Sequence, residues 1–264
     1  MLCTRCRRFD VAPGNELCRQ CEAADAHPPA PLPVPAVAPF AQLRSPVGLG
    51  WAAVALLGAV VLTDLFAIGV DLFAYGVWDD IVQGEAGPGL YRRAELTDTL
   101  FVTAGVLQTV ALVASAVVFV CWFYRVRVNA EVFNPFGHAK KRGWAIAGWI
   151  VPIVSLWYPR RVALDIWDAS GDPERPSGHG LLNGWWTMWI ISLTADRFVS
   201  RAYQRAEEAE ELRRAVAQVM LADLADVVAA VLAIVLVLRL TRMQHAKAMR
   251  GPVAGGVLPT PAVG

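Results

Sequence analysis

The sequence predicts an all-α integral membrane protein: four full transmembrane helices plus one Pro-broken hydrophobic segment (five hydrophobic segments), preceded by a small zinc ribbon. Apolar runs recur from Leu49 to Leu240, and about 20 apolar residues suffice to cross a hydrocarbon layer of ~30 Å. Hydrophobic residues make up 56% of the chain and charged residues only 18%, a balance that is rare in soluble domains. Four cysteines within the first 21 residues predict the ribbon.

The four N-terminal cysteines have the spacing of a zinc ribbon. Cys3 and Cys6 form one CxxC pair, Cys18 and Cys21 form a second, and eleven residues separate the pairs. In a secreted chain such cysteines could form two disulfides, but this spacing suits one tetrahedral Zn²⁺ better. Residues 1–22 are too few to bury a core, so the metal must supply the folding free energy.

The charge of the ribbon argues against nucleic-acid binding. A zinc ion with four thiolate ligands carries about two negative charges, to which Asp10 and Glu16 add. Phe9 is the only aromatic residue there, which is poor material for stacking on bases. The negative charges offset those of Arg5, Arg7, Arg8 and Arg19. We therefore expect a ribbon that binds a protein partner and no nucleic acid.

The next segments are a linker and two spans. Residues 23–46 contain seven prolines among alanines and valines, which favours an extended polyproline linker. Residues 1–46 contain no apolar h-region, so no secretory signal peptide is expected and the first apolar segment acts as the insertion signal. We expect the first span from Leu49 to Ala74, a polar connection over 79–98 with a turn at residues 87–89, and the second span from Leu100 to Tyr124.

The second half of the chain contains the broken segment. Residues 143–159 are apolar but barely long enough to span, and Pro152 at their centre removes a backbone donor. A short amphipathic helix is expected to start at Pro159 and to end before Gly171, with an apolar face formed by Val162, Ile166 and Ala169. The remaining expected elements are a span over 181–198, a charged helix over 199–217, a last span over 219–240 and a disordered tail over 246–264, so the membrane domain comprises residues 47–245.

The distribution of Lys and Arg sets the orientation, because these residues accumulate in cytoplasmic loops. If residues 143–159 cross completely, there are five spans and the basic C-terminus lies outside. If they dip in and return, there are four spans, and the N-terminus, residues 125–142 and the C-terminus are cytoplasmic. We favour the second arrangement because it places more positive charge inside. In this arrangement the non-cytoplasmic side contains Arg201, Arg205, Arg213 and Arg214.

One stretch of the chain carries a resemblance to a known family. Residues 142–161 read RGWAIAGWIVPIVSLWYPRR, followed by DIWDAS over 165–170, with YRVRVN upstream and NGWW downstream. Over residues 50–245 the chain resembles a bacterial multi-pass membrane family known only as domain of unknown function 4328. The resemblance implies the fold and a location in the bacterial inner (plasma) membrane, but no chemistry. Its motif residues here are Gly143, Trp144, Trp149, Pro152, Trp157, Pro159, Asp165, Trp167, Trp185 and Trp186.

Acidic residues within the spans are candidates for ion chemistry. Asp64 and Asp71 are seven residues apart, and Asp223 and Asp226 are three apart, so each pair lies on one helical face. Charges within a membrane are costly, so these residues suggest a path for protons or cations. A structural role is nevertheless the favoured explanation, with Asp223 stabilising a helix N-terminus.

Other polar and aromatic patterns are expected to be structural. Asp196 beside Arg197 is expected to form a simple ion pair. Most of the tryptophans are expected to anchor the helices at the membrane interfaces. The sequence contains no G-x-S-x-G, H-E-x-x-H or Walker motif, so we expect no enzyme.

The function expected from the sequence is that of a non-enzymatic membrane scaffold or sensor, whose cytoplasmic zinc ribbon binds a protein partner. The alternative is a small proton or cation transporter or channel that uses the intramembrane carboxylates. The sequence identifies neither a transported species nor a partner, and it leaves the oligomeric state open, a homo-oligomer included.

Overall fold

The computed structural model describes residues 2–11, 13–19, 21–22, 43–172 and 178–250, and the chain divides into two units, residues 1–41 and 42–264. Most of the predicted linker and residues 251–264 of the predicted tail lie outside the described residues. In the second unit the helices are α2 (Val47–Val82), α3 (Pro88–Phe133), α4 (Trp144–Ile150), η1 (Val154–Leu156), α5 (Tyr158–Ser170), α6 (Gly180–Arg205) and α7 (Ala209–Arg250).

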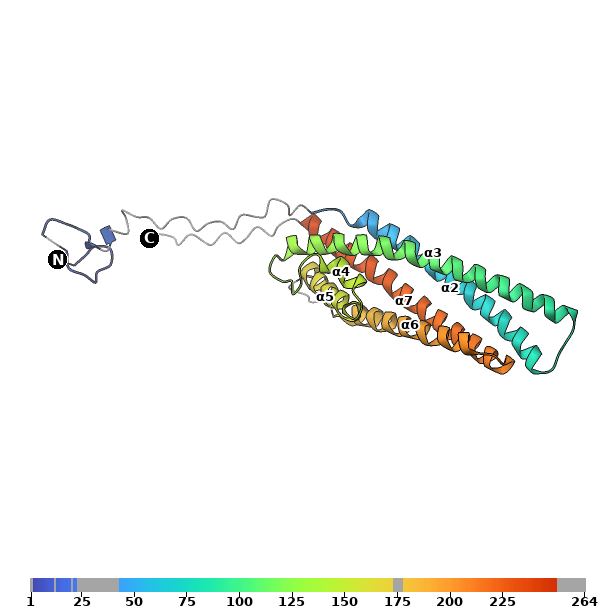
Figure 1. The fold of residues 1–264 in the computed structure, drawn as a ribbon. Helices are drawn as coiled ribbons and strands as arrows, with labels where there is room; N and C mark the ends of the chain where they lie inside the picture. Colours follow the sequence, from blue (N-terminus) through green and yellow to red (C-terminus); the bar gives the residue numbers. More distant parts are fainter. Residues whose placement is uncertain (1, 12, 20, 23–42, 173–177, 251–264) are drawn as a thin grey trace. The chain divides into compact units, whose positions relative to one another are not determined.

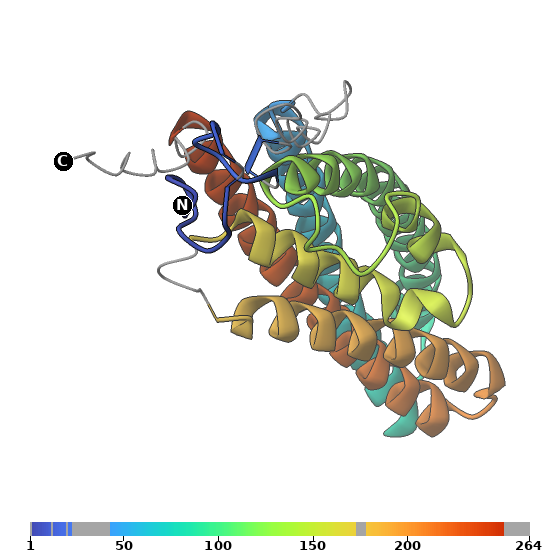
Figure 2. The same cartoon turned by 90° about the vertical axis from the view of Figure 1, so that its left-hand side faces the viewer.

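Four long helices run along the length of the second unit (Figures 1 and 2). Helix α2 packs against α3 and α7, and α6 packs against α7, whereas α3 and α6 meet through aromatic rings, Phe101 with Tyr203 and Phe119 with Trp185. The loops at 83–87 and 206–208 lie together at one end, which we call the far end (Figure 1). The start of α2 and the ends of α3 and α7 lie at the opposite end, which we call the basic end.

Three of these helices, α2, α3 and α7, are long and apolar enough to cross a membrane. They contain 36, 46 and 42 residues, and at 1.5 Å per residue each exceeds ~50 Å, well beyond a ~30 Å hydrocarbon layer. The apolar stretches of the predicted spans are thus only the central parts of longer helices. Helix α6 has 26 residues and is not among the three.

Two predicted boundaries differ from the structure. The polar connection predicted over 79–98 shrinks to residues 83–87, because α2 and α3 both continue through polar residues. Its turn lies where predicted, with Gly87 at a positive φ and Pro88 in the first turn of α3. The charged helix predicted over 199–217 is interrupted at 206–208, and α7 extends to Arg250, into the tail that was predicted to be disordered.

The broken segment reverses direction instead of crossing as one helix. Helix α4 has seven residues and rises only ~10 Å, a third of the hydrocarbon thickness. It ends before Pro152, and Ile153 adopts a positive φ that β-branched residues rarely accept. The tip of the reversal is apolar and exposed, with Ile150 75% and Ile153 69% accessible. Such a tip suits contact with lipid rather than water.

The amphipathic helix predicted to start at Pro159 is present as α5. Its buried face carries Val162, Ile166 and Ala169, as the pattern predicted, and it packs against α3, α6 and α7. Its last carbonyls are held from α7, where Lys247 Nζ donates to the Ala169 oxygen at 2.8 Å. Helix α5 therefore belongs to the core of the bundle at its basic end.

Aromatic side chains fill the core next to α5. The Trp149 ring contacts Phe119 and Trp189, each with a centroid separation of 5.6 Å and near-perpendicular planes. Trp185 and Trp186 also contact Trp149 and are buried. Edge-to-face packing within the bundle accounts for these tryptophans, in addition to the anchoring at the membrane interfaces that was predicted for them.

A polar network joins four segments at the basic end. The Gln244 amide of α7 donates to the Val126 carbonyl at 2.8 Å and to Ser170 Oγ at 3.0 Å. Asn129 of α3 donates to Gln244 Oε1 at 3.1 Å and to the Arg44 carbonyl at 2.8 Å. The Arg44 N–H returns a bond to Asn129 Oδ1 at 3.0 Å. The Gln244–Asn129 network thus ties the start of α2 to α3, α5 and α7.

The contact between α2 and α7 predicts the effect of a glycine substitution. A Cβ atom at Gly50 would lie 2.8 Å from Thr241 Oγ1, which accepts a bond from Trp122 Nε1. Gly50→Val should therefore lower the free energy of unfolding by about 1–3 kcal/mol more than Gly58→Val, whose Cβ meets nothing within 4 Å. Thermal unfolding in detergent measures both variants, and equal losses would contradict this packing.

Candidate functional site

The four N-terminal cysteines converge on one point. Their Sγ atoms all lie within 4.8 Å of one another, and Cys6 Sγ and Cys18 Sγ are 3.7 Å apart. A tetrahedral zinc with Zn–S bonds of ~2.3 Å requires sulfur atoms ~3.8 Å apart, so this separation suits one ion. A disulfide needs ~2.05 Å, and the described cysteines are all free. The donor set therefore fits a thiolate-binding metal.

The backbone around Cys3 and Cys18 holds the thiols in place. The Cys3 N–H donates to the Phe9 carbonyl at 2.9 Å, and Arg7, at a positive φ, turns the chain between them. The Cys18 N–H donates to Cys3 Sγ at 3.3 Å. Hydrogen bonds from backbone N–H groups, first that of Cys6, lower the pKa of the Cys3 thiol to about 6. A thiolate is the form that ligates a metal.

A second cluster lies in the membrane domain, far along the helices from the basic end. Gln108 of α3 donates its amide Nε2 to Asp64 Oδ1 of α2 and to Asp223 Oδ1 of α7, both at 3.1 Å. The Asp71 carboxyl group of α2 also lies within hydrogen-bonding reach of Asp223. The structure therefore brings together three of the four predicted carboxylates.

The fourth carboxylate, Asp226, faces α6. Ser192 and Asp196 of α6 both lie within hydrogen-bonding reach of it. The expected ion pair between Asp196 and Arg197 is not among the ion pairs of the described residues, and Asp196 belongs to the acidic group instead. Together, the residues that we call the carboxyl cluster are Asp64, Asp71, Asp196, Asp223 and Asp226.

The position of Asp223 excludes the role expected for it at a helix N-terminus. Helix α7 begins at Ala209, so Asp223 lies about four turns inside it, whereas the effect of the helix dipole is confined to the first turn. The sequence analysis also missed Gln108 and Ser192. Gln108 is the only side-chain amide between Leu100 and Tyr124, and this isolation in an apolar run was a signal that could have revealed it.

No cation balances the carboxyl cluster within the described part of the chain. Its five aspartates take part in none of the ion pairs there. Asp64 and Asp71 are only 4% and 1% exposed, yet the Oδ2 atom of each has no hydrogen-bond partner. A buried polar atom left without a partner costs about 1–3 kcal/mol, so these two oxygens call for a ligand.

The family-motif residues build the basic end and do not contribute to either cluster. Trp144 stacks edge-on against Tyr158 at 4.7 Å, and Asp165 Oδ2 accepts the Ala139 N–H at 2.8 Å. His138 lies beside them with both ring nitrogens buried, and this burial lowers the pKa of its imidazole. Trp167 is buried beneath the Arg239 guanidinium, which lies 5.2 Å from its ring.

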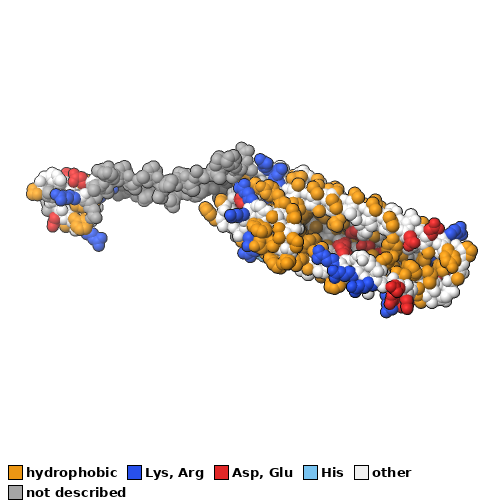
Figure 3. Space-filling view, viewed as in Figure 1, with side chains coloured by type: hydrophobic (Ala, Val, Ile, Leu, Met, Phe, Trp, Pro, Cys, Tyr) orange, Lys and Arg blue, Asp and Glu red, His pale blue; other side chains and the backbone are white. Residues whose placement is uncertain are grey.

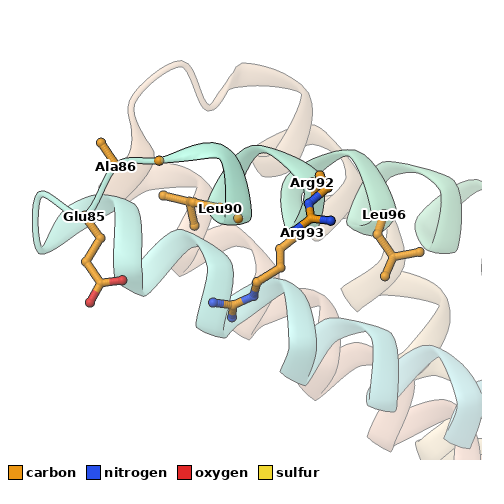
Figure 4. Close-up of a pocket in the computed structure, with 8 residues that line it drawn as sticks. Glu85, Ala86, Leu90, Arg92, Arg93 and Leu96 are labelled. Carbon is orange, nitrogen blue, oxygen red and sulfur yellow. The ribbon is translucent and has the colours of Figure 1, made fainter.

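Two of the hollows on the surface of the bundle lie away from both clusters. One, of about 600 Å³, is lined by the turn before α3 and its first residues, including Glu85, Arg92 and Arg93 (Figure 4). Arg93 is paired with Asp80 at 2.6 Å. The other, of about 590 Å³, is an apolar groove between α2 and α3. Its lining suits a lipid chain better than a polar substrate.

The comparisons with known proteins identify a family but no individual relative. Residues 89–242 match the family described as "Domain of unknown function (DUF4328)". No curated protein and no solved structure matches the chain. The match extends from Gly89 in α3 to Arg242 in α7 and covers more than half of the sequence. The chain belongs to the DUF4328 family of proteins of unknown function.

Proposed function

We propose that this chain is a non-enzymatic scaffold or sensor of a bacterial inner membrane, which binds a protein partner through a cytoplasmic zinc ribbon. The observation that carries the proposal is the convergence of four cysteine Sγ atoms in a module joined to a bundle of membrane-length helices. A small module held by a metal presents its side chains on a surface, which suits the binding of a protein partner. The module therefore serves recognition rather than catalysis.

Zinc is the metal that best suits the ribbon. Four thiolates in a tetrahedral arrangement favour Zn²⁺ or iron, and a closed site with no open position is typical of structural zinc. The Cys6–Cys18 separation of 3.7 Å supports this geometry. The metal would order a segment that has few other stabilising contacts.

The proposed orientation has four spans, with α6 as the fourth, and the basic end in the cytoplasm. At the far end, positive charges are paired with carboxylates: Arg213 with Asp79 at 2.5 Å, and Arg93 with Asp80 at 2.6 Å. The reversal at residues 151–157 supports a segment that enters the membrane and returns to the side from which it came. Lys and Arg of the basic end are more numerous: Arg125, Arg127, Lys140, Lys141, Arg142, Arg160, Arg161, Arg239, Arg242, Lys247 and Arg250. This excess of positive charge favours a cytoplasmic location for the basic end.

The zinc ribbon predicts the effect of removing two ligands. The purified wild type should contain one zinc per chain, and Cys18→Ser with Cys21→Ser should abolish it, because hydroxyl groups replace thiolates poorly at zinc. Metal analysis of the purified protein measures both, and Cys121→Ser provides the matched control that keeps its zinc. Proteins that co-purify with the wild type but not with the double variant would be the partners. A zinc-free wild type, or a partner that still binds the double variant, would contradict the proposal.

The orientation predicts the location of reporters fused to the chain. A reporter after Arg250 should be active in the cytoplasm, because the α7 end lies at the basic end. A reporter inserted at Ala86, in the turn of the far end, should be active outside the membrane. The fold survives such an insertion because residues 83–87 form an exposed loop. A periplasmic signal after Arg250 would show that residues 143–159 cross and that there are five spans.

A further inference from the structure

The carboxyl cluster suits a ligand that neutralises negative charge but does not require coordination by several oxygen atoms. Among the described residues, only the four cysteines bring three or more metal-binding atoms within 4.8 Å of one another. The aspartates instead interact pairwise, Asp71 with Asp223 and Asp196 with Asp226. Hard metal ions need several oxygens at 2.0–2.6 Å, which this arrangement does not offer.

A proton is the simplest ligand for a pair of neighbouring carboxyl groups. Two carboxylates at hydrogen-bonding distance repel each other unless one of them carries a proton, which then bridges the two oxygens. The amide of Gln108 donates both to Asp64 and to Asp223 and thereby connects α2 with α7 through α3. A neutral amide favours ionised acceptors but supplies no positive charge. The protons must therefore come from solution.

The unpartnered oxygens give an independent sign of a missing ligand. Asp64 Oδ2 and Asp71 Oδ2 are buried within the bundle, and each lacks any hydrogen-bond partner. Asparagine would provide similar hydrogen bonds at these positions at much lower cost, because an amide has no charge to bury. Carboxyl groups without a cation partner are therefore suited to taking up and releasing protons.

The cluster reaches the surface through one member, which lies nearer the far end than the basic end. Asp196 is exposed and lies nine residues before the end of α6, and Figure 3 shows acidic side chains within a recess of the long face. Farther toward the end of α6, Tyr203 meets Phe101 of α3, with ring centroids 5.9 Å apart. One turn toward the basic end, Val60, Ala111 and Ala230 form an apolar layer. The aromatic core around Trp149 extends this apolar layer toward the basic end.

From these observations we infer that the carboxyl cluster is a proton-binding site that exchanges protons with the far end of the bundle and not with the basic end. The groups that face it are Asp64 and Asp71 from α2, Gln108 from α3, Ser192 and Asp196 from α6, and Asp223 and Asp226 from α7. Tyr203 of α6 lies near Asp71 and near Asp98 of α3. This inference names the signal for the proposed sensor, and the compartment that it reads rests on the proposed orientation.

Proton uptake by the purified full-length chain tests the site without reference to its orientation. Between about pH 8 and about pH 5, exposed carboxylates stay ionised, whereas the four histidines and the N-terminal amine gain protons in every variant, so the difference between variants isolates the cluster. The wild type should show protonated-carboxyl bands in infrared difference spectra, and Asp71→Asn and Asp223→Asn should each lose about one proton of uptake. Asp196→Asn tests the exposed member, whose substitution leaves the buried core unchanged. Glu85→Gln, in the exposed turn, is the matched control and should titrate like the wild type.

The outcomes separate this inference from the proposed function. Uptake that is unchanged in Asp196→Asn and in either folded buried variant would overturn the proton site, while the zinc ribbon and the orientation would stand. Competition of Na⁺ or Mg²⁺ with the uptake would also overturn it in favour of a metal site. In vesicles with one orientation, a pH step on the far-end side alone should produce the uptake. Net proton flux through wild-type vesicles would overturn the one-sided opening and indicate a transporter.

Discussion

The structure depends on one constraint: a polar side chain between membrane helices must find its partner inside the protein, because lipid offers none. At the basic end the Gln244–Asn129 network meets this constraint. Gln244 and Asn129 are 1% and 2% exposed, and each makes several hydrogen bonds to other segments. The same bonds fix where α2 starts relative to α3, α5 and α7. The polar groups there act as structural cross-links between helices.

Farther along the same helices, the constraint is not met. Asp64 and Asp71 are buried as deeply as the residues of the Gln244–Asn129 network, yet each keeps an oxygen without a partner. The apolar layer of Val60, Ala111 and Ala230 separates the two regions. Hydrogen bonds within the protein thus cross-link the helices at the basic end. The half toward the far end contains acidic groups that can take up protons. This division assigns structure to the basic end and exchange with solution to the far end.

Much of the fold could be predicted from local patterns in the sequence. Hydropathy located the centres of α2, α3 and α7, and helical periodicity placed Val162 and Ile166 on the buried face of α5. The CxxC spacing predicted the convergence of the cysteines, because each pair is local and only one loop must close. These features depend on neighbours in the sequence, and short-range patterns record them well.

The features that the sequence did not predict depend on contacts between distant segments. Trp149 reaches Trp185 and Trp189 only through the reversal of residues 151–157, so an interface role looked equally reasonable from the sequence. Asp196 meets Asp226 across two helices, while the adjacent Arg197 offered a simpler but incorrect partner. The lengths of α2 and α3 exceeded the predicted spans because polar residues extend a helix without any change in its hydrogen bonds.

The central claim is that α2 and α7 bring acidic side chains face to face inside the bundle, and a disulfide cross-link tests it most directly. In a chain with Cys121→Ser, the pair Asp71→Cys and Asp223→Cys should form a disulfide on mild oxidation, seen by mass spectrometry as linked peptides. The pair Leu72→Cys and Leu224→Cys, on exposed faces of the same helices, should remain unlinked. Linkage of the 72–224 pair without linkage of the 71–223 pair, in folded protein, would contradict the arrangement of the carboxyl cluster.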